Sequence, residues 1–243
     1  KEGTILFQMK KKQTFVIDGL GGEKRLKGTV KIEGAKNAAL KAMAAAVLFD
    51  GEVTLTNMPD NEDVKTLTEI MRKLGAKVTK DDGKSAGNHK NDEEESIVRI
   101  DASNVGSTDI DPELAQSMRA SVTLTGPLLA RFGKVTFPKQ GGCVIGARPI
   151  DLFIEGYKKM GAVVEENGFY DIKVAERLSG AEIFFSKQTV GGTETLMMAA
   201  VLARGKTTLK NCAMEPEIES VAEWLNECGA DIKGAGTTTI EIN

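Results

Sequence analysis

A sequence repeat constrains the fold of this chain more than any other feature. Residues 45–57 and 199–211 are identical at eight of 13 positions, and a Gly-Ala pair follows each copy at the same distance. A weaker third copy lies between them. Units of roughly 70–80 residues exceed the length of most solenoid repeats, so each should contain several helices and strands. The landmarks of the three copies are Gly75-Ala76, Gly133, Gly161-Ala162 and Gly229-Ala230.

Each unit has the same order of predicted elements. A short strand with alternating apolar residues comes first, such as Val30 and Ile32 or Ile183 and Phe185. A helix rich in Ala, Leu and Met follows, then a glycine, a second strand, a second helix with charged positions and a closing strand or strand pair. The predicted first helices are residues 38–49, 112–125 and 194–203, and the second helices are residues 61–74, 149–160 and 216–228. The predicted second strands are residues 53–55, 135–137 and 207–209, and the closing strands are residues 97–100, 170–174 and 238–242.

The first helices determine the predicted architecture. They are apolar on nearly all sides, so they should be buried. Three buried helices with three small sheets outside them form one compact α/β domain rather than three separate domains. We therefore predict one domain over residues 20–243, made of repeats at about 24–105, 106–176 and 177–243.

Composition and charge exclude several classes of protein. The chain of 243 residues is 41% apolar and 28% charged, as expected of a globular protein with a sizeable core. Its net charge of −3 argues against a nucleic-acid partner. No apolar run reaches the roughly 18 residues that a membrane span needs, which argues against a membrane partner. The basic residues 10–12 are not followed by the apolar stretch of a signal peptide, so we expect a cytoplasmic protein.

The cysteines and the single histidine argue against a metal site. Cys143, Cys212 and Cys228 are widely spaced and form no Cys-x-x-Cys pair, which fits a reducing compartment and offers no zinc framework. His89 lies in a polar stretch, where it is expected to be solvated. One histidine supports neither a histidine-based metal centre nor, in that setting, a Ser-His-Asp triad.

The segment Gly141–Pro149 departs from the repeat. Gly51 and Gly75 in the first unit are 24 residues apart, as are Gly205 and Gly229 in the third. In the middle unit Gly133 and Gly161 are 28 residues apart, and the extra residues fall in this segment. It carries Cys143 and Arg148 among three glycines. A guanidinium binds phosphate or carboxylate and can lower the pKa of a nearby thiol. The alternative is a glycine-rich surface turn with an incidental cysteine. A loop that is longer than the corresponding segments of the other two repeats, however, favours a functional role.

The starts of the predicted first helices are further candidate sites. Lys36 and Asn37 begin the first, Arg119 lies among small and apolar residues of the second, and the glycine-rich stretch 187–192 precedes the third. Helix starts bind anions through free N–H groups and the helix dipole. Asn37 could instead be a helix cap and Lys36 a solvated side chain. If the three starts converge, they form a pocket for a small, highly anionic substrate.

Several motifs together resemble the N-terminal half of the enolpyruvyl transferases that act on UDP-N-acetylglucosamine. The likeness runs from about residue 15 to residue 243, and its motifs occur in the order typical of that family. The motifs are Gly34-Ala35-Lys36-Asn37-Ala38-Ala39-Leu40, Met118-Arg119-Ala120-Ser121, Gly126-Pro127-Leu128, Gly141–Leu152 and Glu215-Pro216-Glu217-Ile218.

The resemblance implies a fold and a reaction. The fold is an inside-out α/β barrel domain built from three βαβαββ repeats with buried helices. The reaction transfers the enolpyruvyl group of phosphoenolpyruvate to the 3′-hydroxyl of UDP-N-acetylglucosamine, the first committed step of peptidoglycan synthesis, without a metal or other cofactor. By the same resemblance Cys143 is the general acid, and Lys36 and Arg148 contact phosphoenolpyruvate. The residues implied on the sugar-nucleotide side are Asn37, Arg119, Pro149, Ile150, Asp151, Leu152, Lys187, Gln188, Thr189 and Val190.

The chain also departs from the family pattern. Thr123 replaces a tryptophan and Phe153 a histidine found in some members, which affects the expected nucleotide contacts. Residues 83–96 are a hydrophilic insertion without a predicted catalytic role. Family members have about twice as many repeats, and their second, C-terminal domain pairs with the segment that corresponds to residues 1–19. We therefore expect this half alone to have negligible activity, because closure of the two domains assembles the site.

Two alternative functions remain open on the sequence alone. One is a 3-phosphoshikimate 1-carboxyvinyltransferase, against which the cysteine segment argues. The other is a non-catalytic half-domain that binds UDP-sugars or a protein partner.

Overall fold

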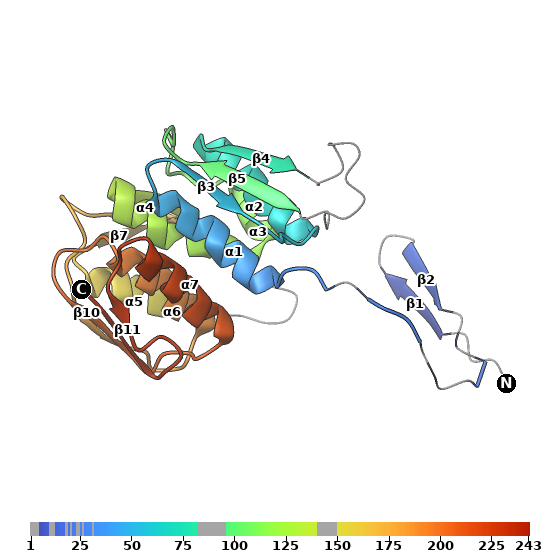
Figure 1. The fold of residues 1–243 in the computed structure, drawn as a ribbon. Helices are drawn as coiled ribbons and strands as arrows, with labels where there is room; N and C mark the ends of the chain where they lie inside the picture. Colours follow the sequence, from blue (N-terminus) through green and yellow to red (C-terminus); the bar gives the residue numbers. More distant parts are fainter. Residues whose placement is uncertain are drawn as a thin grey trace. The chain divides into compact units, whose positions relative to one another are not determined.

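The computed structural model describes residues 5–9, 13–17, 19, 21–22, 25, 27–30, 32–81, 96–139 and 150–243. The chain divides after Ile32 into two compact units. In the first unit, β1 (Ile5–Met9) and β2 (Gln13–Ile17) form an antiparallel hairpin (Figure 1). His89 and the predicted insertion up to residue 95 lie outside the described residues.

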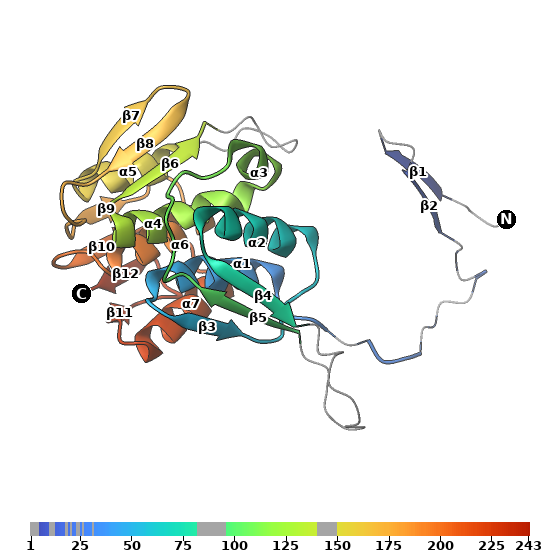
Figure 2. The same ribbon diagram turned by 90° about the horizontal axis from the view of Figure 1, so that it is seen from above.

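The second unit, Glu33–Asn243, contains the repeats (Figures 1 and 2). In the first repeat, β3 and β4 both pair antiparallel with β5, which lies between them. The elements are α1 (Lys36–Ala45), the 3-10 turn η1 (Ala46–Leu48), β3 (Glu52–Leu55), α2 (Glu62–Leu74), β4 (Lys77–Asp81) and β5 (Ile97–Asp101).

The second and third repeats have the same order of elements. The middle sheet has the order β6-β8-β7, and the third has the order β11-β12-β10-β9. The middle repeat contains α3 (Pro112–Ser117), the 3-10 segment η2 (Arg119–Leu124), α4 (Thr125–Phe132), β6 (Lys134–Pro138), α5 (Asp151–Lys159), β7 (Val163–Glu166) and β8 (Phe169–Lys173). The third contains β9 (Glu182–Phe184), α6 (Val190–Ala200), β10 (Thr207–Lys210), α7 (Pro216–Glu227), β11 (Ile232–Lys233) and β12 (Thr239–Ile242).

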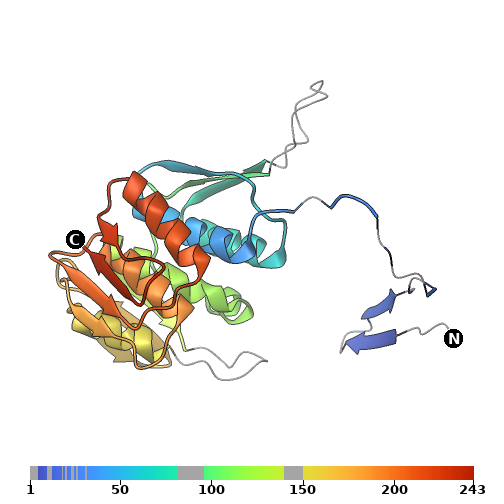
Figure 3. The same cartoon turned by 60° about the horizontal axis from the view of Figure 1, so that its bottom comes forward.

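The predicted architecture of buried helices and outer sheets is confirmed. Every residue of α6 from Gly192 to Ala200 is buried, as is most of α1. Figure 3 shows the sheet of β3, β4 and β5 on one side of the helices and the sheet of β9 to β12 on another. Gly75, Gly161 and Gly229, which follow the second helices, all have positive φ, as expected of residues that end helices. No helix of the described residues is long and apolar enough to cross a bilayer.

The middle inner helix differs from the prediction. We expected one helix over residues 112–125, but the chain is extended at Met118 and continues as a 3-10 segment before α4 begins at Thr125. Pro127 has no N–H to donate to the carbonyl of Thr123, four residues earlier, which fits a 3-10 segment that lasts until Leu124. Proline is tolerated in the first turn of a helix, which is where α4 places it. The Ser121 hydroxyl satisfies the carbonyl of Met118 at 2.6 Å.

The first strand of the first repeat was predicted wrongly. Val30 and Ile32 belong to no strand in the described residues, and their side chains are 79% and 80% exposed. In the third repeat the corresponding strand, β9, pairs parallel with β10. In the described part of the middle repeat, a single parallel bridge joins Asp109 and Thr136 at this place. Beside β3 lies a groove of about 370 Å³, bounded by α1, by residues 54–58 and by α7.

Close contact between the inner helices yields a stability prediction. A methyl group on Gly126 of α4 would collide with the backbone carbonyl of Thr195 on α6. In an exposed helix Gly→Ala stabilises by about 1 kcal/mol. Because backbone cannot retreat as a side chain can, we expect Gly126→Ala to lower the free energy of unfolding by roughly 1–3 kcal/mol, measured by urea denaturation. The control is Gly106→Ala, where the nearest atom is 4.0 Å away. Equal stability of the two variants would contradict the prediction.

Candidate functional site

The starts of three helices meet at one end of the second unit. Lys36, the first residue of α1, pairs with Asp63 in the first turn of α2, with 2.7 Å between Nζ and Oδ2. Asn37 donates from Nδ2 to Oε1 of Glu217 in the first turn of α7, at 3.3 Å. Helix starts carry free N–H groups and partial positive charge. The structure therefore brings the start of α1 next to the starts of the second helices α2 and α7, which is not the set of three first-helix starts that the sequence suggested.

The Lys36 and Asn37 side chains are arranged differently from the simplest alternatives. Ala35 is the cap residue of α1 and makes no side-chain capping bond, so Asn37 is not the helix cap. Lys36 is exposed, but its charge is paired with Asp63. An exposed ion pair contributes only about 0–1 kcal/mol, so an incoming anion could compete with Asp63 for the lysine.

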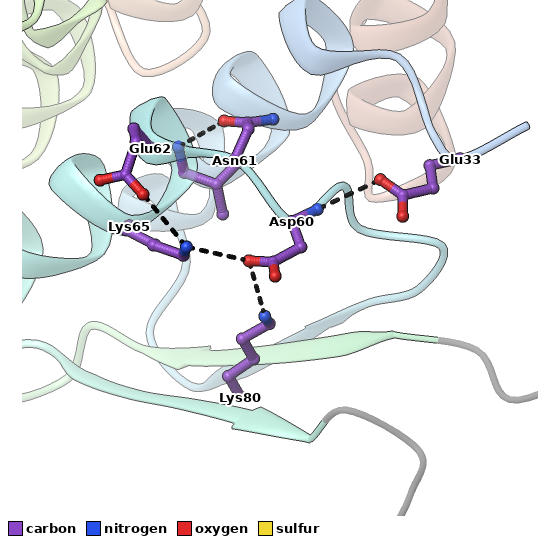
Figure 4. Close-up of polar contacts among 7 residues, drawn as sticks. Glu33, Asp60, Asn61, Glu62, Lys65 and Lys80 are labelled. Carbon is purple, nitrogen blue, oxygen red and sulfur yellow. Dashed lines mark hydrogen bonds and ion pairs between the residues drawn. The ribbon is translucent and has the colours of Figure 1, made fainter. Parts of the chain in front are cut away.

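A network of charges holds the start of α2 in place (Figure 4). The Asn61 side chain accepts a hydrogen bond from Val64 N at 3.0 Å and caps the helix. Asp60 lies within 3.2 Å of Lys80 Nζ and 3.5 Å of Lys65 Nζ, and Lys80 is the main cause of the lowered pKa of Asp60. These contacts fix the segment that leads to Asp63, the partner of Lys36.

Two of the predicted residues around the start of α6, Gln188 and Val190, line a small groove. Thr189 caps α6, its Oγ1 accepting from Gly192 N at 3.2 Å, which is why the helix begins at Val190 and not at Glu194 as predicted. Gln188 donates from Nε2 to the carbonyl of Cys212 at 3.1 Å, and Lys187 is exposed. The groove has a volume of about 310 Å³ and is lined by Gln188, Val190, Ala213, Met214 and Glu215.

The predicted residues at the start of α5 lie close to the start of α6. Ile150 is buried, Asp151 is exposed and Leu152 is half-buried. Phe153 is buried, and its ring would be 3.3 Å from a methyl group on Gly191. Phe153, which differs from the histidine of some family members, therefore packs against the first turn of α6.

The middle inner helix carries two more of the residues singled out from the sequence. Arg119 is half-buried at the start of η2, and Thr123 is buried within it. Cys143, Arg148 and Pro149 lie outside the described residues, together with the rest of residues 140–149. That segment connects the end of β6 to the residue before α5.

The sequence reasoning missed a buried ion pair. Lys41 of α1 and Glu194 of α6 are 2.7 Å apart, with side chains 10% and 0% exposed. Burial raises the pKa of Glu194 to about 7, against the lowering effect of Lys41; Glu217 and Glu215 raise it further. The sequence did contain a signal for this pair. Each of two predicted helices that are otherwise apolar carries one charged residue of opposite sign, and buried charges in proteins are usually paired.

A family match decides what the chain is related to. A model of the family described as EPSP synthase (3-phosphoshikimate 1-carboxyvinyltransferase) matches residues 20–243. The chain belongs to the EPSP synthase family. Its fold agrees with that of the enolpyruvyl transferase NikO from Streptomyces tendae, with a TM-score of 0.72 and 25% identity over 91% of this chain and 49% of the other. EPSP synthase from Acinetobacter baumannii shares the fold at 18% identity, with a TM-score of 0.64 over 91% of this chain and 48% of the other.

Relatives within the EPSP synthase family have more similar sequences. UDP-N-acetylglucosamine 1-carboxyvinyltransferase from Desulforapulum autotrophicum is 48% identical over 91% of this chain and 50% of its own length. The protein of the same name from Actinobacillus pleuropneumoniae serotype 5b is 49% identical over 89% of this chain and 49% of its own. The chain thus spans about half the length of the curated relatives it matches.

The buried pair gives a pH-dependent stability prediction. The pKa of Glu194 is raised from 4.5 to about 7, so its contribution to stability falls as the pH rises through that interval. Lys41→Met leaves the carboxyl unpaired and should cost roughly 3–5 kcal/mol at pH 8. The loss should be about 1 kcal/mol smaller at pH 6, where the carboxyl is protonated. Urea denaturation at both pH values measures it.

Lys65→Met, which removes an exposed pair, is the control and should cost less than about 1 kcal/mol at either pH. A loss for Lys41→Met that does not depend on pH would refute a titrating Glu194.

Proposed function

We propose that this chain is the N-terminal half of an enzyme that transfers the enolpyruvyl group of phosphoenolpyruvate to the 3′-hydroxyl of UDP-N-acetylglucosamine and releases phosphate. The reaction begins peptidoglycan synthesis, and we place it in the cytoplasm. The observation that carries the proposal is 48% identity, over 91% of the chain, to a relative named for this reaction. Likeness to the EPSP synthases of known structure is far lower, at 17% and 18% identity, which favours the sugar nucleotide over shikimate phosphate as acceptor.

The chemistry needs an acid and fixed positive charge. Addition of the sugar hydroxyl to the enol carbon requires a proton at the methylene carbon, which a positioned acid supplies. We assign this role to Cys143, as the family likeness indicates. Elimination of phosphate then returns a proton from that carbon and restores the enol double bond, and the proton of the attacking hydroxyl leaves with the released phosphate. Lys36 and Arg148 are assigned to the phosphate and carboxylate of phosphoenolpyruvate, whose charge they balance.

The sugar nucleotide is assigned to the converging helix starts. Asn37, held by Glu217, keeps its side-chain oxygen available to accept a hydrogen bond from the sugar. The groove beside Gln188 offers an amide and aliphatic walls next to the start of α6, whose dipole favours a diphosphate. No metal or cofactor is assigned. The remaining residues proposed for this side are Arg119, Pro149, Ile150, Asp151, Leu152, Lys187, Thr189 and Val190.

A second domain is the proposed partner of this chain. Relatives are about twice as long, and domain closure would complete the site and exclude water. On this basis the 243-residue chain alone binds ligands but turns over negligibly. The same half coverage also favours the second candidate function, a UDP-sugar-binding half-domain without catalysis.

Alkylation of Cys143 distinguishes the two candidate functions. An epoxide of the fosfomycin type should add once to the chain, measured by intact mass, because a thiol beside an arginine is more reactive. Cys143→Ala should abolish the adduct, while Cys228→Ala, at an exposed free cysteine, should leave it unchanged. An adduct that persists in Cys143→Ala would remove the assigned role of Cys143 and favour binding without catalysis.

Binding of UDP-N-acetylglucosamine tests the sugar-nucleotide assignment. Asn37→Ala and Gln188→Ala each remove one hydrogen-bonding amide and should weaken binding about tenfold, measured by calorimetry. Asn167→Ala, an exposed amide in the β7–β8 turn, is the matched control and should bind as the original chain does. Preferential binding of shikimate 3-phosphate would instead support the related reaction on that acceptor.

A further inference from the structure

Lys41 and Glu194 lie one layer beneath the proposed sugar-nucleotide site. Asn37 and Lys41 are four residues apart on α1, so their side chains leave the same face of the helix. Asn37 contacts Glu217 on α7, while Lys41 contacts Glu194 on α6. Glu217 in turn acts electrostatically on Glu194. One face of α1 therefore connects the site amide to the buried pair through two carboxylates.

Glu194 is poorly satisfied for a buried charge. Its side chain is fully buried, and neither carboxylate oxygen accepts a hydrogen bond from the described residues apart from the ion pair that Oε2 forms with Lys41. The attraction within a buried ion pair of this kind barely offsets the free energy of removing both charges from water. Two apolar residues in the same place would stabilise the core equally well. Stability alone thus gives little reason for the pair at this position.

We propose that Lys41 and Glu194 are positioning residues for the substrate site, acting through Glu217 on the side-chain amide of Asn37. This inference rests on the proposed function for the identity of the substrate. Protonation of Glu194 removes one negative charge next to Glu217 and leaves the Lys41 ammonium to attract Glu217 alone. The hydrogen bond from Asn37 and the net charge beneath the site then change together.

The charges around Glu194 place this change near neutral pH. Within the described residues, Lys41 from α1 and Glu217 and Glu215 from the start of α7 are the charged groups that shift its pKa, which burial raises to about 7. Tyr157, on the neighbouring α5, stays neutral because burial raises its pKa too. The diphosphate of a UDP-sugar does not titrate between pH 6 and 8, so a pH dependence of binding in that range reports on the protein.

The first test needs no ligand. The 243-residue chain, labelled with ¹⁵N, is titrated from pH 5.5 to 8.5, and the side-chain amide resonances of Asn37 are followed by NMR. We expect an inflection near pH 7 that is lost in Glu194→Gln, which keeps the size and shape of the side chain. Glu219→Gln, an exposed glutamate on the same helix α7, should keep the inflection. An unchanged inflection in Glu194→Gln, or none in the original chain, would overturn the proposal.

The second test uses the ligand. Binding of UDP-N-acetylglucosamine should weaken roughly fivefold or more between pH 6 and pH 8, because ionised Glu194 adds negative charge beneath an anion site. Glu194→Gln should bind with little pH dependence, and Glu219→Gln, at an exposed glutamate of α7, should keep the pH dependence of the original chain. A pH dependence that survives in Glu194→Gln counts against the positioning role. If the sugar nucleotide does not bind at any pH, the proposed function fails, and the ligand-free titration still decides this inference.

Discussion

The requirement to bury three helices that are apolar on nearly all sides governs the structure. Neither α1 nor α6 has a face suited to water, so each needs neighbours all around it. The sheets supply one side of this cover and the second helices α2, α5 and α7 supply the rest, which is why one repeat could not fold alone. Close contacts such as Gly126 against Thr195 follow from the same requirement, since interior helices approach until their backbones touch.

The same packing creates the candidate site. Because α1, α2 and α7 have neighbouring starts, their free N–H groups and positive dipole ends gather in one place. Polar side chains then collect there: Lys36 on Asp63, and Asn37 on Glu217. The inner helices tolerate charge only where an opposite charge is in reach, as Lys41 and Glu194 are for each other. The position of the Glu194 carboxyl beneath the proposed anion site thus follows from how the core is built.

The sequence was sufficient where one local rule decides the outcome. Helical periodicity, glycines after helices and alternating strands located the second strands and second helices of the three repeats, whereas β4, β7 and β11 received no predicted bounds. It was insufficient where distant or competing effects decide. Residues 112–132 form two helices and a 3-10 segment, although the composition of residues 112–125 alone predicts one continuous helix. Val30 and Ile32 alternate as strand residues do, yet a strand needs a partner edge as well as a pattern. The pairing of Lys41 with Glu194 joins positions 153 residues apart, which helical periodicity cannot connect.

Comparison of the first and third repeats separates positions that the backbone conformation fixes from positions at the helix starts, where the two sequences differ. Asn57 and Asn211 occupy equivalent positions, and both have a positive φ that few residues other than glycine and asparagine adopt readily. Backbone geometry requires the same residue in both copies. The helix starts show the opposite, since Lys36-Asn37 in α1 corresponds to Val190-Gly191 in α6. Under the proposed function these helix starts would contact different parts of one asymmetric substrate, so the repeat gives no reason for their sequences to match.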